Sequence, residues 1–453
     1  MSFKALSRRK FKVKLIYNFW LKFSAKRTKM QTTKLSKKAQ IHSVIAASSG
    51  NLVEWFDFYI YGFAAVYFAH NFSNATSTLF QQIEIFGVFA AGFLMLPVGS
   101  IIFGKMADIK ERKRAMIVSI IFMAFGSFGI AFLPDKQAIG DIAVVFLLLL
   151  RLIQGIAVGG EFGIVAAYLT EIAPQGKRGF VSSFQYVTII GGQLLAVASI
   201  SLLFLFIDER QMQEFGWRIL FFVGGVLAVL SLFFRSFIQD NSHKVLENYA
   251  DRGSFKALFK SYKALLIVIG VTAGCTIGFY AITVYPKVFM INNGVDTILA
   301  NNIMLGSLFV LCVAIPFIGA ISDKIGFKIS LFIYLGFCLV GTYPLFMALK
   351  SVALSGSNEF LLFVIVCFMC FMLSFYTAVA AISKTSLFPP QIRALGAGLG
   401  CMISVGLFGG SVNYVALQFK ALGIEWGFFV YFGVIACISL ICTALIPKQR
   451  ELD

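Results

Sequence analysis

The stretch Gly104-Lys-Met-Ala-Asp108 occurs twice in this chain, the second time as Gly319-Ala-Ile-Ser-Asp323. The second copy begins 215 residues after the first. The loop 174–178 recurs at the same distance as 389–393, each loop beginning with Pro, at Pro174 and Pro389, and ending with Arg, at Arg178 and Arg393. Two separate segments that share one offset indicate an internal duplication rather than chance. The sequence therefore predicts two related halves that follow each other in the same order.

The composition indicates a membrane protein. Of 453 residues, 59% are hydrophobic and only 13% are charged, whereas soluble domains carry roughly 25% charged residues. Apolar segments recur at about the 20-residue length that a helix needs to cross the hydrocarbon layer. Because these runs are long and uninterrupted, a β-barrel is excluded. We predict an all-α membrane protein with twelve transmembrane helices, at roughly 44–69, 80–103, 115–133, 142–168, 181–206, 218–238, 264–290, 300–319, 329–349, 360–384, 394–420 and 427–446.

One polar connector, the segment 239–263, divides the predicted spans into two sets of six. Parallel repeats of this kind place their binding site between the halves, near the middle of the membrane. The predicted organisation is a basic tail at 1–41, an N-terminal six-helix bundle at 42–238, the linker at 239–263, a C-terminal six-helix bundle at 264–446 and a short tail at 447–453.

Basic residues are concentrated on one side of the predicted membrane. The net charge is +18, and residues 1–41 hold thirteen Lys and Arg and no acid. An excess of Lys and Arg in cytosolic loops explains this pattern better than a nucleic-acid partner does. We therefore expect a multi-pass protein of the cell inner membrane with both termini and the linker in the cytosol. Residues 1–29, ahead of Met30, are read as a surface-lying tail or a seldom-used upstream start, and their acid-free composition also resembles a transit peptide.

The reactive residue types give no sign of a catalytic or metal centre. All eight cysteines lie in apolar segments of the second half, and Cys367 and Cys370 form a CxxC with no His or acid beside it. We interpret them as small core residues rather than as metal ligands or a disulfide. The sequence also lacks a nucleotide-binding loop and a nucleophile–base pair. No cofactor is expected, and an enzyme is disfavoured.

Two motifs resemble those of one transporter superfamily. The loop Gly104-Lys-Met-Ala-Asp108-Ile-Lys-Glu-Arg112-Lys113 and its repeat are similar to the GxxxDxxGRR signature of the major facilitator superfamily. Arg151-Leu-Ile-Gln154-Gly155 is similar to the RxxQG motif of its fourth helix. The resemblance implies two six-helix bundles that rock around a central site.

Longer stretches resemble one branch of this superfamily. Asn51-Leu-Val-Glu54-Trp55-Phe-Asp57-Phe-Tyr59 and Val158-Gly-Gly-Glu161 look like the metabolite:proton symporters. Within that branch, the stretches 48–70, 182–193 and 388–396 resemble the 2-oxoglutarate (α-ketoglutarate) permeases. The resemblance implies proton-coupled uptake of a small organic acid, with 2-oxoglutarate or a similar carboxylate expected first.

Three positions depart from the pattern of the branch. Leu96 stands before Pro97 where members usually carry Arg, which removes a cation expected near the pathway. Glu111 replaces a loop glycine that the repeat keeps as Gly326. Ser386 replaces an acid that is usual before Phe-Pro in the loop between the tenth and eleventh spans.

The first predicted span carries acids near the middle of the membrane. Asn51, Glu54 and Asp57 are spaced by three and share a helix face with Tyr61. The two acids fall about 15–20 Å into the span, where an acid usually faces a wet cavity or a partner. We expect Asp57 or Glu54 to carry the coupled proton. The alternative is a fixed ion pair that holds helices together.

A cation lies at a similar depth. Arg151 is about 14 Å into the fourth span, and a guanidinium can hold a carboxylate through two hydrogen bonds. It is expected to pair with an acid of the first span or with the substrate. Lys287 and Lys384 are weaker candidates, and Lys384 is expected to extend its amine to the cytosol. Tyr280 is read as an interfacial belt residue or as part of an outer gate.

Seven side chains form the predicted substrate site, with a core role as the alternative for the glutamines and tyrosine of the fifth span. They are Arg151, Asn51, Gln154, Gln185, Tyr186, Gln193 and Tyr280.

Glycines and charges at the other end of the fourth span predict packing and a gate. Gly155, Gly159 and Gly163 are four apart, a spacing typical of close helix approach. Glu161 is expected to meet Arg112 or Arg178 near the cytosol. The alternative for the gate charges is plain solvation of loop residues. The predicted cytosolic gate consists of Asp108, Arg112, Glu161, Arg178, Asp323 and Arg393.

The predicted function is therefore proton-coupled uptake of a small organic acid by a monomer in the lipid bilayer. The second substrate class is an osmolyte such as proline or betaine, which resembling members of the branch carry. A transporter-like membrane receptor is the alternative from another class. The gate motifs and mid-membrane charges argue against a receptor, because a receptor need not alternate.

Overall fold

The computed structural model describes residues 37–109, 112–236, 253–356 and 358–447. These residues are largely helical, and no strand occurs among them. The chain divides into two compact units, Met1–His42 and Ser43–Asp453. The helices belong to the second unit, apart from the first residues of α2 (Lys37–Phe72). Most of the predicted basic tail and residues 239–252 of the predicted linker lie outside the described residues, so these domain boundaries stay predictions.

Helices of the first half follow the predicted spans one to six. After α2 come α3 (Thr78–Leu94), α4 (Leu96–Ile109), α5 (Arg112–Ala131), α6 (Lys136–Ile139), α7 (Ile142–Gly159), α8 (Glu161–Ile172), α9 (Arg178–Leu203), α10 (Glu209–Gln211), η1 (Met212–Gly216) and α11 (Trp217–Ser236).

Helices of the second half follow spans seven to twelve, after a short helix at the end of the predicted linker. They are α13 (Phe255–Lys260), α14 (Tyr262–Thr283), α15 (Tyr285–Ile291), α16 (Thr297–Ile325), α17 (Phe327–Val340), α18 (Thr342–Ser355), α19 (Glu359–Thr377), α20 (Ala380–Thr385), η2 (Pro390–Ile392), α21 (Arg393–Ser404), η3 (Val405–Gly409), α22 (Ser411–Ala421) and α23 (Trp426–Leu445).

The helix lengths agree with twelve membrane spans. Within the described residues, nine continuous helical segments are long and apolar enough to cross a membrane, and α17 with α18, bent by 51°, forms a tenth. α2 has 36 residues and carries two acids, and α5 has 20 residues of which Ile117–Ala131 are apolar. These two helices complete the set, and the predicted all-α architecture is confirmed.

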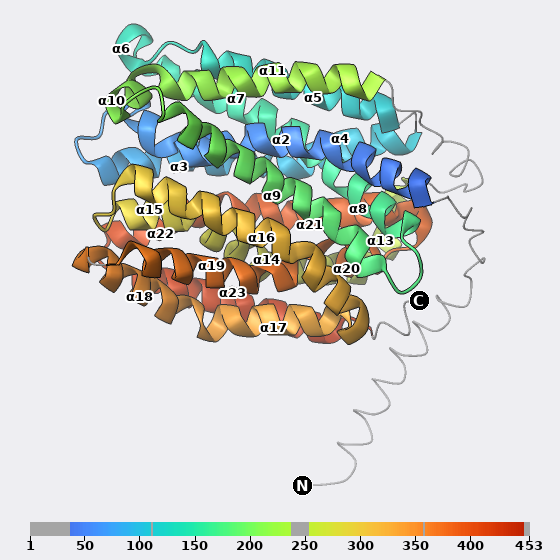
Figure 1. Ribbon diagram of the computed structural model, residues 1–453. Coiled ribbons are helices and arrows are strands. Elements are labelled where there is room, and N and C mark those ends of the chain that lie inside the picture. The colour runs from blue at the N-terminus through green and yellow to red at the C-terminus, as the bar shows by residue number, and fades with distance from the viewer. Residues whose placement is uncertain (1–36, 110–111, 237–252, 357, 448–453) are drawn as a thin grey trace. The chain divides into compact units, whose positions relative to one another are not determined.

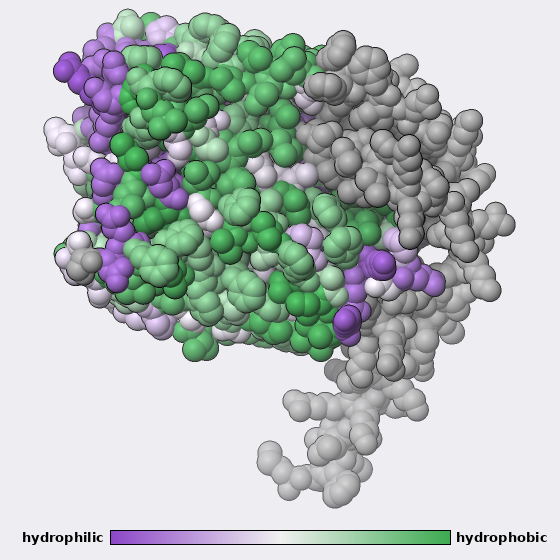
Figure 2. Space-filling view, in the orientation of Figure 1, coloured by the Kyte–Doolittle hydropathy of each residue, from purple (hydrophilic) through white to green (hydrophobic). Residues whose placement is uncertain are grey.

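The two halves lie side by side and meet along two seams. In Figure 1, helices of the first half (blue to green) lie above those of the second half (yellow to red), and most run in nearly parallel directions. α9 packs along α16, and α3 and α4 pack along α22 and α21. Figure 2 shows a wide apolar surface over the helices, with hydrophilic residues gathered at the end shown on the left. Side chains such as Phe125, Phe132 and Phe317 are more than half exposed on the apolar faces, as expected for lipid contact.

The glycines of α7 and α8 allow close helix crossings. A Cβ atom at Gly155 would lie 1.9 Å from the carbonyl oxygen of Gly92, and one at Gly159 would lie 2.0 Å from that of Leu96. A Cβ at Gly163 would lie 2.4 Å from the carbonyl oxygen of Ala394 in the other half. The predicted packing role of these glycines is therefore confirmed. Leu96, which lies at the Gly159 crossing, is itself fully buried.

Candidate functional site

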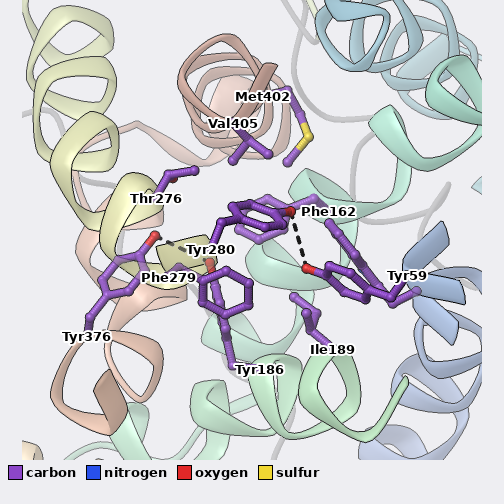
Figure 3. Close-up of a pocket in the computed structure, with 11 residues that line it drawn as sticks. Tyr59, Phe162, Tyr186, Ile189, Thr276, Phe279, Tyr280, Tyr376, Met402 and Val405 are labelled. Atoms are coloured by element: carbon purple, nitrogen blue, oxygen red, sulfur yellow. Dashed lines mark hydrogen bonds between the residues drawn. The ribbon is translucent and has the colours of Figure 1, made fainter. Parts of the chain in front are cut away.

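A pocket lies between the two halves (Figure 3). The free space inside it is only about 20 Å³, close to what a single water molecule needs. Most of its walls are aromatic. The first half contributes Trp55, Tyr59, Phe162, Tyr186 and Ile189, and the second half contributes Thr276, Phe279, Tyr280, Tyr376, Met402 and Val405.

Two tyrosine pairs cross this pocket. The hydroxyl oxygens of Tyr59 and Tyr280 are 3.2 Å apart, and those of Tyr186 and Tyr376 are 3.3 Å apart (Figure 3). Each pair joins one residue of the first half to one of the second, so separation of the halves breaks both bonds. Among the seven predicted substrate-binding residues, Tyr186 and Tyr280 line the pocket. The interfacial-belt reading of Tyr280 is wrong, because its side chain is buried against the pocket instead of facing the membrane surface.

Asp57 lies in a buried polar network between α2, α5 and α7. Ser127 donates its hydroxyl hydrogen to Asp57 Oδ2, and Gln154 Nε2 donates to the same oxygen at 3.0 Å. Asp57 Oδ1 has no hydrogen-bond partner among the described residues. It occupies space that a Cβ at Gly224 on α11 would fill, at 2.0 Å. The network therefore holds one carboxylate oxygen and leaves the other unbonded.

Arg151 reaches this network only indirectly. Its Nη1 donates to Gln154 Oε1 at 2.7 Å, and no ion pair joins it to Asp57. The predicted direct pairing with an acid of the first span is thus replaced by a bridge through Gln154. The guanidinium carbon lies 4.6, 4.4 and 5.3 Å from the ring centroids of Phe58, Tyr61 and Phe89. Arg151 is fully buried but is not part of the pocket lining, so its predicted contact with substrate stays a prediction.

The remaining predicted polar liners bond to neighbouring helices. Asn51 Nδ2 donates to Thr188 Oγ1 at 3.0 Å, and Gln185 Nε2 donates to the carbonyl oxygen of Phe162 at 3.0 Å. Gln193 Nε2 donates to Thr283 Oγ1 at 3.3 Å, across the two halves. Gln185 and Gln193 do not line the pocket, and their binding role stays a prediction. Glu54, the second predicted proton carrier, is buried and accepts from Ser119 Oγ at 3.3 Å.

Lys384 differs most from its prediction. Its side chain is 1% exposed, and its Nζ donates to Tyr376 Oη and Cys401 Sγ, both at 3.2 Å. The expectation that it extends to the cytosol is wrong, because α20 turns it inward toward pocket-lining tyrosines. Its place at the end of a predicted span made it a weaker candidate, and the signal that could have raised it is that no other charged residue lies between Glu359 and Arg393.

The predicted gate forms part of one end of the bundle, here called the Asp323 end. Asp323 Oδ1 accepts from the backbone N–H of Gly179 at 2.6 Å, and Oδ2 accepts from that of Phe180 at 3.0 Å. Both donors belong to the first turn of α9, which Arg178 begins. A carboxylate at a helix N-terminus is favourable because the unpaired N–H groups point toward it. Asp323 of the second half therefore holds α9 of the first half.

Two further bonds join the halves at the Asp323 end. Arg393 Nη1 lies 3.0 Å from Glu171 Oε1, an acid that the sequence analysis did not single out. Thr170 Oγ1 and Thr385 Oγ1 are 3.1 Å apart and are separated by 215 residues in sequence. Each of these two threonines is thus the repeat counterpart of the other.

The other predicted gate residues are Glu161, Arg178, Asp108 and Arg112. Glu161 is buried at the start of α8, about 16 Å from the end of that helix. It therefore lies deeper than predicted, because α8 continues to Ile172. Its pairing with Arg112 or Arg178 stays a prediction. The side chains of Asp108 and Arg112 are outside the described part of the structure.

The opposite end of the bundle, here called the Lys287 end, is also bridged. Lys287 is 1% exposed, and its Nζ donates to Phe63 O at 3.0 Å and Tyr67 Oη at 3.1 Å on α2. It also donates to Asn301 Oδ1 on α16 at 2.9 Å. Asn292 Nδ2 donates to Gln82 Oε1 at 3.1 Å, again between halves. Hydrogen bonds therefore join the halves on both sides of the pocket.

Comparison with known proteins agrees with this arrangement. Residues 43–252 match a family model described as "Sugar (and other) transporter". The chain is 41% identical over 420 residues to the alpha-ketoglutarate permease of Escherichia coli, covering 92% of this chain and 96% of that protein. It is 29% identical to the citrate-proton symporter of Klebsiella pneumoniae (89% and 91% covered) and 30% identical to the proline/betaine transporter of Salmonella typhimurium (81% and 75% covered).

A solved structure has the same fold. The chain aligns with a partially occluded inward-open conformation of the xylose transporter XylE from E. coli, with a TM-score of 0.71 at 15% identity and 91% and 98% coverage. Two related helical halves around a central pocket define a secondary transporter. The chain belongs to the major facilitator superfamily, in its metabolite:proton symporter family. It is therefore a transporter and not an enzyme.

Proposed function

We propose that this protein takes up a small carboxylate together with protons by alternating access, with 2-oxoglutarate as the first substrate to test. The observation that carries the proposal is the Asp57 network, in which a fully buried acid has one oxygen without a hydrogen-bond partner in the part of the chain that the structure describes. The 41% identity to an alpha-ketoglutarate permease supports the substrate class.

The proposed cycle uses the charge of Asp57. An ionised acid inside the membrane is costly unless donors or a cation compensate it. Ser127 and Gln154 donate to the ionised form at Oδ2, and Arg151 lies behind Gln154. Oδ1 is available to take the proton. Protonation removes the buried negative charge, so the loaded carrier can rock, and release of the proton on the other side resets it.

The membrane setting is part of the same proposal. The basic tail, the linker and the loop before α9 carry the excess of Lys and Arg, which favours the cytosolic side for the Asp323 end. We place both termini in the cytosol, the protein in the cell inner membrane, and the working unit as a monomer. We keep the bundle boundaries proposed from the sequence, 42–238 and 264–446, in this proposal.

An osmolyte such as proline or betaine is the second candidate. The aromatic walls of the pocket favour it, because ring faces attract quaternary ammonium groups. Lys384, bonded to the pocket-lining Tyr376, disfavours it, because two cations at one site repel each other. The two candidates therefore differ in whether the pocket prefers a substrate that carries net negative charge.

Uptake by the purified protein in liposomes tests the proposal. For Asp57→Asn, we expect uptake of 2-oxoglutarate driven by a pH gradient to fall at least about tenfold, because the amide cannot take up and release the proton. Counterflow, which needs no net proton movement, should stay within a few-fold of the unmodified protein.

Glu54→Gln is the comparison variant, since it removes the second candidate acid from the same helix, one that accepts from Ser119. Full gradient-driven uptake by Asp57→Asn would refute the role of Asp57, and loss in Glu54→Gln alone would move the proton to Glu54. A wild-type protein that carries betaine and ignores carboxylates would decide for the second candidate.

A further inference from the structure

Lys384 is a buried cation at the edge of the pocket. It lies on α20, which begins after a break in helical structure around Val379. Its Nζ is 5.0 Å from the ring centroid of Phe162, 5.4 Å from that of Tyr376 and 6.0 Å from that of Tyr186. All three rings line the pocket. The ammonium therefore lies behind the aromatic wall of the pocket and is bonded to the hydroxyl of one of the lining tyrosines, Tyr376.

No acid balances this charge in the described part of the chain. The contacts of Lys384 are the hydroxyl of Tyr376, the thiol of Cys401 and the faces of the three rings. Ring faces and neutral acceptors recover only part of the cost of a buried ammonium. An ammonium has three donors, and two of them are used by Tyr376 and Cys401. The Lys384 ammonium therefore has one donor and its positive charge left for an anion to bind.

We propose that Lys384, together with the hydroxyls of Tyr376 and Tyr186, binds one carboxylate group of the substrate. This inference rests on the proposed function, since it names the residues that recognise the carboxylate class. An ammonium and two phenolic hydroxyls supply several donors from one side, which is what a carboxylate with about four lone-pair sites requires. It also replaces the cation that is missing at Leu96, from a different helix.

Binding at this position would act on both halves of the molecule. Tyr186 belongs to α9 of the first half, and Tyr376 belongs to α19 of the second. In the present structure their hydroxyls satisfy each other at 3.3 Å. A carboxylate between them would accept from both, so the substrate would replace the bond that joins the halves. The second tyrosine pair, Tyr59 and Tyr280, is then available to the rest of the substrate.

Binding of two truncated substrates to purified full-length protein tests the proposal. Levulinate lacks the C1 carboxylate of 2-oxoglutarate and 2-oxovalerate lacks the C5 carboxylate. Their dissociation constants are measured by competition with radiolabelled 2-oxoglutarate. For Lys384→Gln, we expect at least about tenfold weaker binding of 2-oxoglutarate and of the one monoacid whose carboxylate Lys384 holds. The other monoacid should bind both proteins within a few-fold, because it never contacts Lys384.

Equal weakening of both monoacids, or of neither, would overturn the assignment. Lys350→Gln is the control, since it removes another lysine of the second half that is ion-paired with Glu425 at 2.5 Å. If the monoacids compete too weakly to measure, Lys384→Arg decides: restored binding of 2-oxoglutarate supports the charge, and a loss equal to that of Lys384→Gln refutes it. If Lys384→Gln fails to fold, Tyr376→Phe keeps the ring and should weaken 2-oxoglutarate several-fold. A wild-type protein that binds no carboxylate would refute the proposed function itself.

Discussion

At the scale of single residues, Arg151 shows how a buried cation is held without an acid beside it. Three ring faces enclose its guanidinium at 4.4–5.3 Å, and Nη1 donates to Gln154. Its Nε and Nη2 have no partner among the described residues. A planar, weakly hydrated guanidinium suits this environment, whereas a compact ammonium does not. Arg151 is thus placed to act on Asp57 through Gln154.

We therefore expect Arg151→Lys to disturb coupling more than binding. Gradient-driven uptake should fall about tenfold, since the ammonium loses the ring contacts and the reach to Gln154. The affinity for 2-oxoglutarate should stay within a few-fold, because Arg151 does not line the pocket. Arg218→Lys is the control, as Arg218 also lies over an aromatic ring, Trp217 at 4.2 Å, but away from this network. A fall in affinity as large as the fall in uptake would support the other prediction, that Arg151 contacts the substrate.

Side-chain direction limited what the sequence could predict at this scale. Spacing along a helix places Asp57 at mid-membrane and on one face with its neighbours, and the structure buries it as an acid of that depth requires. Spacing does not say which face meets the other half. Tyr186 was therefore predicted together with Gln185, although only Tyr186 lines the pocket. Ser127, which donates to Asp57, comes from another helix and gives no signal in the sequence.

At the scale of helices, breaks in two spans bring lysines into the interior. The seventh and tenth spans read as continuous from hydropathy, but α14 ends at Thr283 before α15, and α19 ends at Thr377 before α20. Hydropathy averages over about 20 residues and cannot show a break of one or two. Pro286 was the local signal for the first break, since proline cannot continue the hydrogen-bond ladder. The break turns Lys287 toward α2 and α16.

The Lys287 end should open more readily when that bridge is removed. In Lys287→Met, the bonds to Phe63, Tyr67 and Asn301 are lost while the side-chain length is nearly kept. We expect a cysteine at position 82, which is 2% exposed in this structure, to react with a soluble maleimide about tenfold faster. The comparison is with Gln82→Cys alone, in a background that lacks the eight native cysteines. An unchanged rate would show that Lys287 does not hold this end closed.

At the scale of the whole molecule, the duplication explains both the architecture and where the halves meet. Hydropathy predicted the helices, and the loops repeated at one offset predicted two six-helix halves with a site between them. Both signals are properties of long segments. The contacts at the seam were not predictable in the same way. Asp323 was expected to belong to a gate, but its acceptance of two N–H groups at the start of α9 depends on how the halves dock. Docking is set by many small contacts that no motif records.

Thr170 and Thr385 lie close to the axis of the rotation that relates the two halves, because a residue can touch its own repeat counterpart only near that axis. Their Oγ1 atoms are 3.1 Å apart at the Asp323 end, and both side chains are buried. If the halves rock around the central pocket, this pair must separate each time that end opens. In Thr170→Cys/Thr385→Cys without the native cysteines, oxidation should form a disulfide, since the side chains already meet. We expect the oxidised protein in liposomes to lose about nine-tenths or more of its uptake, and a reductant to restore it, whereas either single cysteine should be insensitive to oxidation. Full uptake by the cross-linked protein would mean that transport does not open the Asp323 end, and the rocking mechanism would have to be abandoned for this chain.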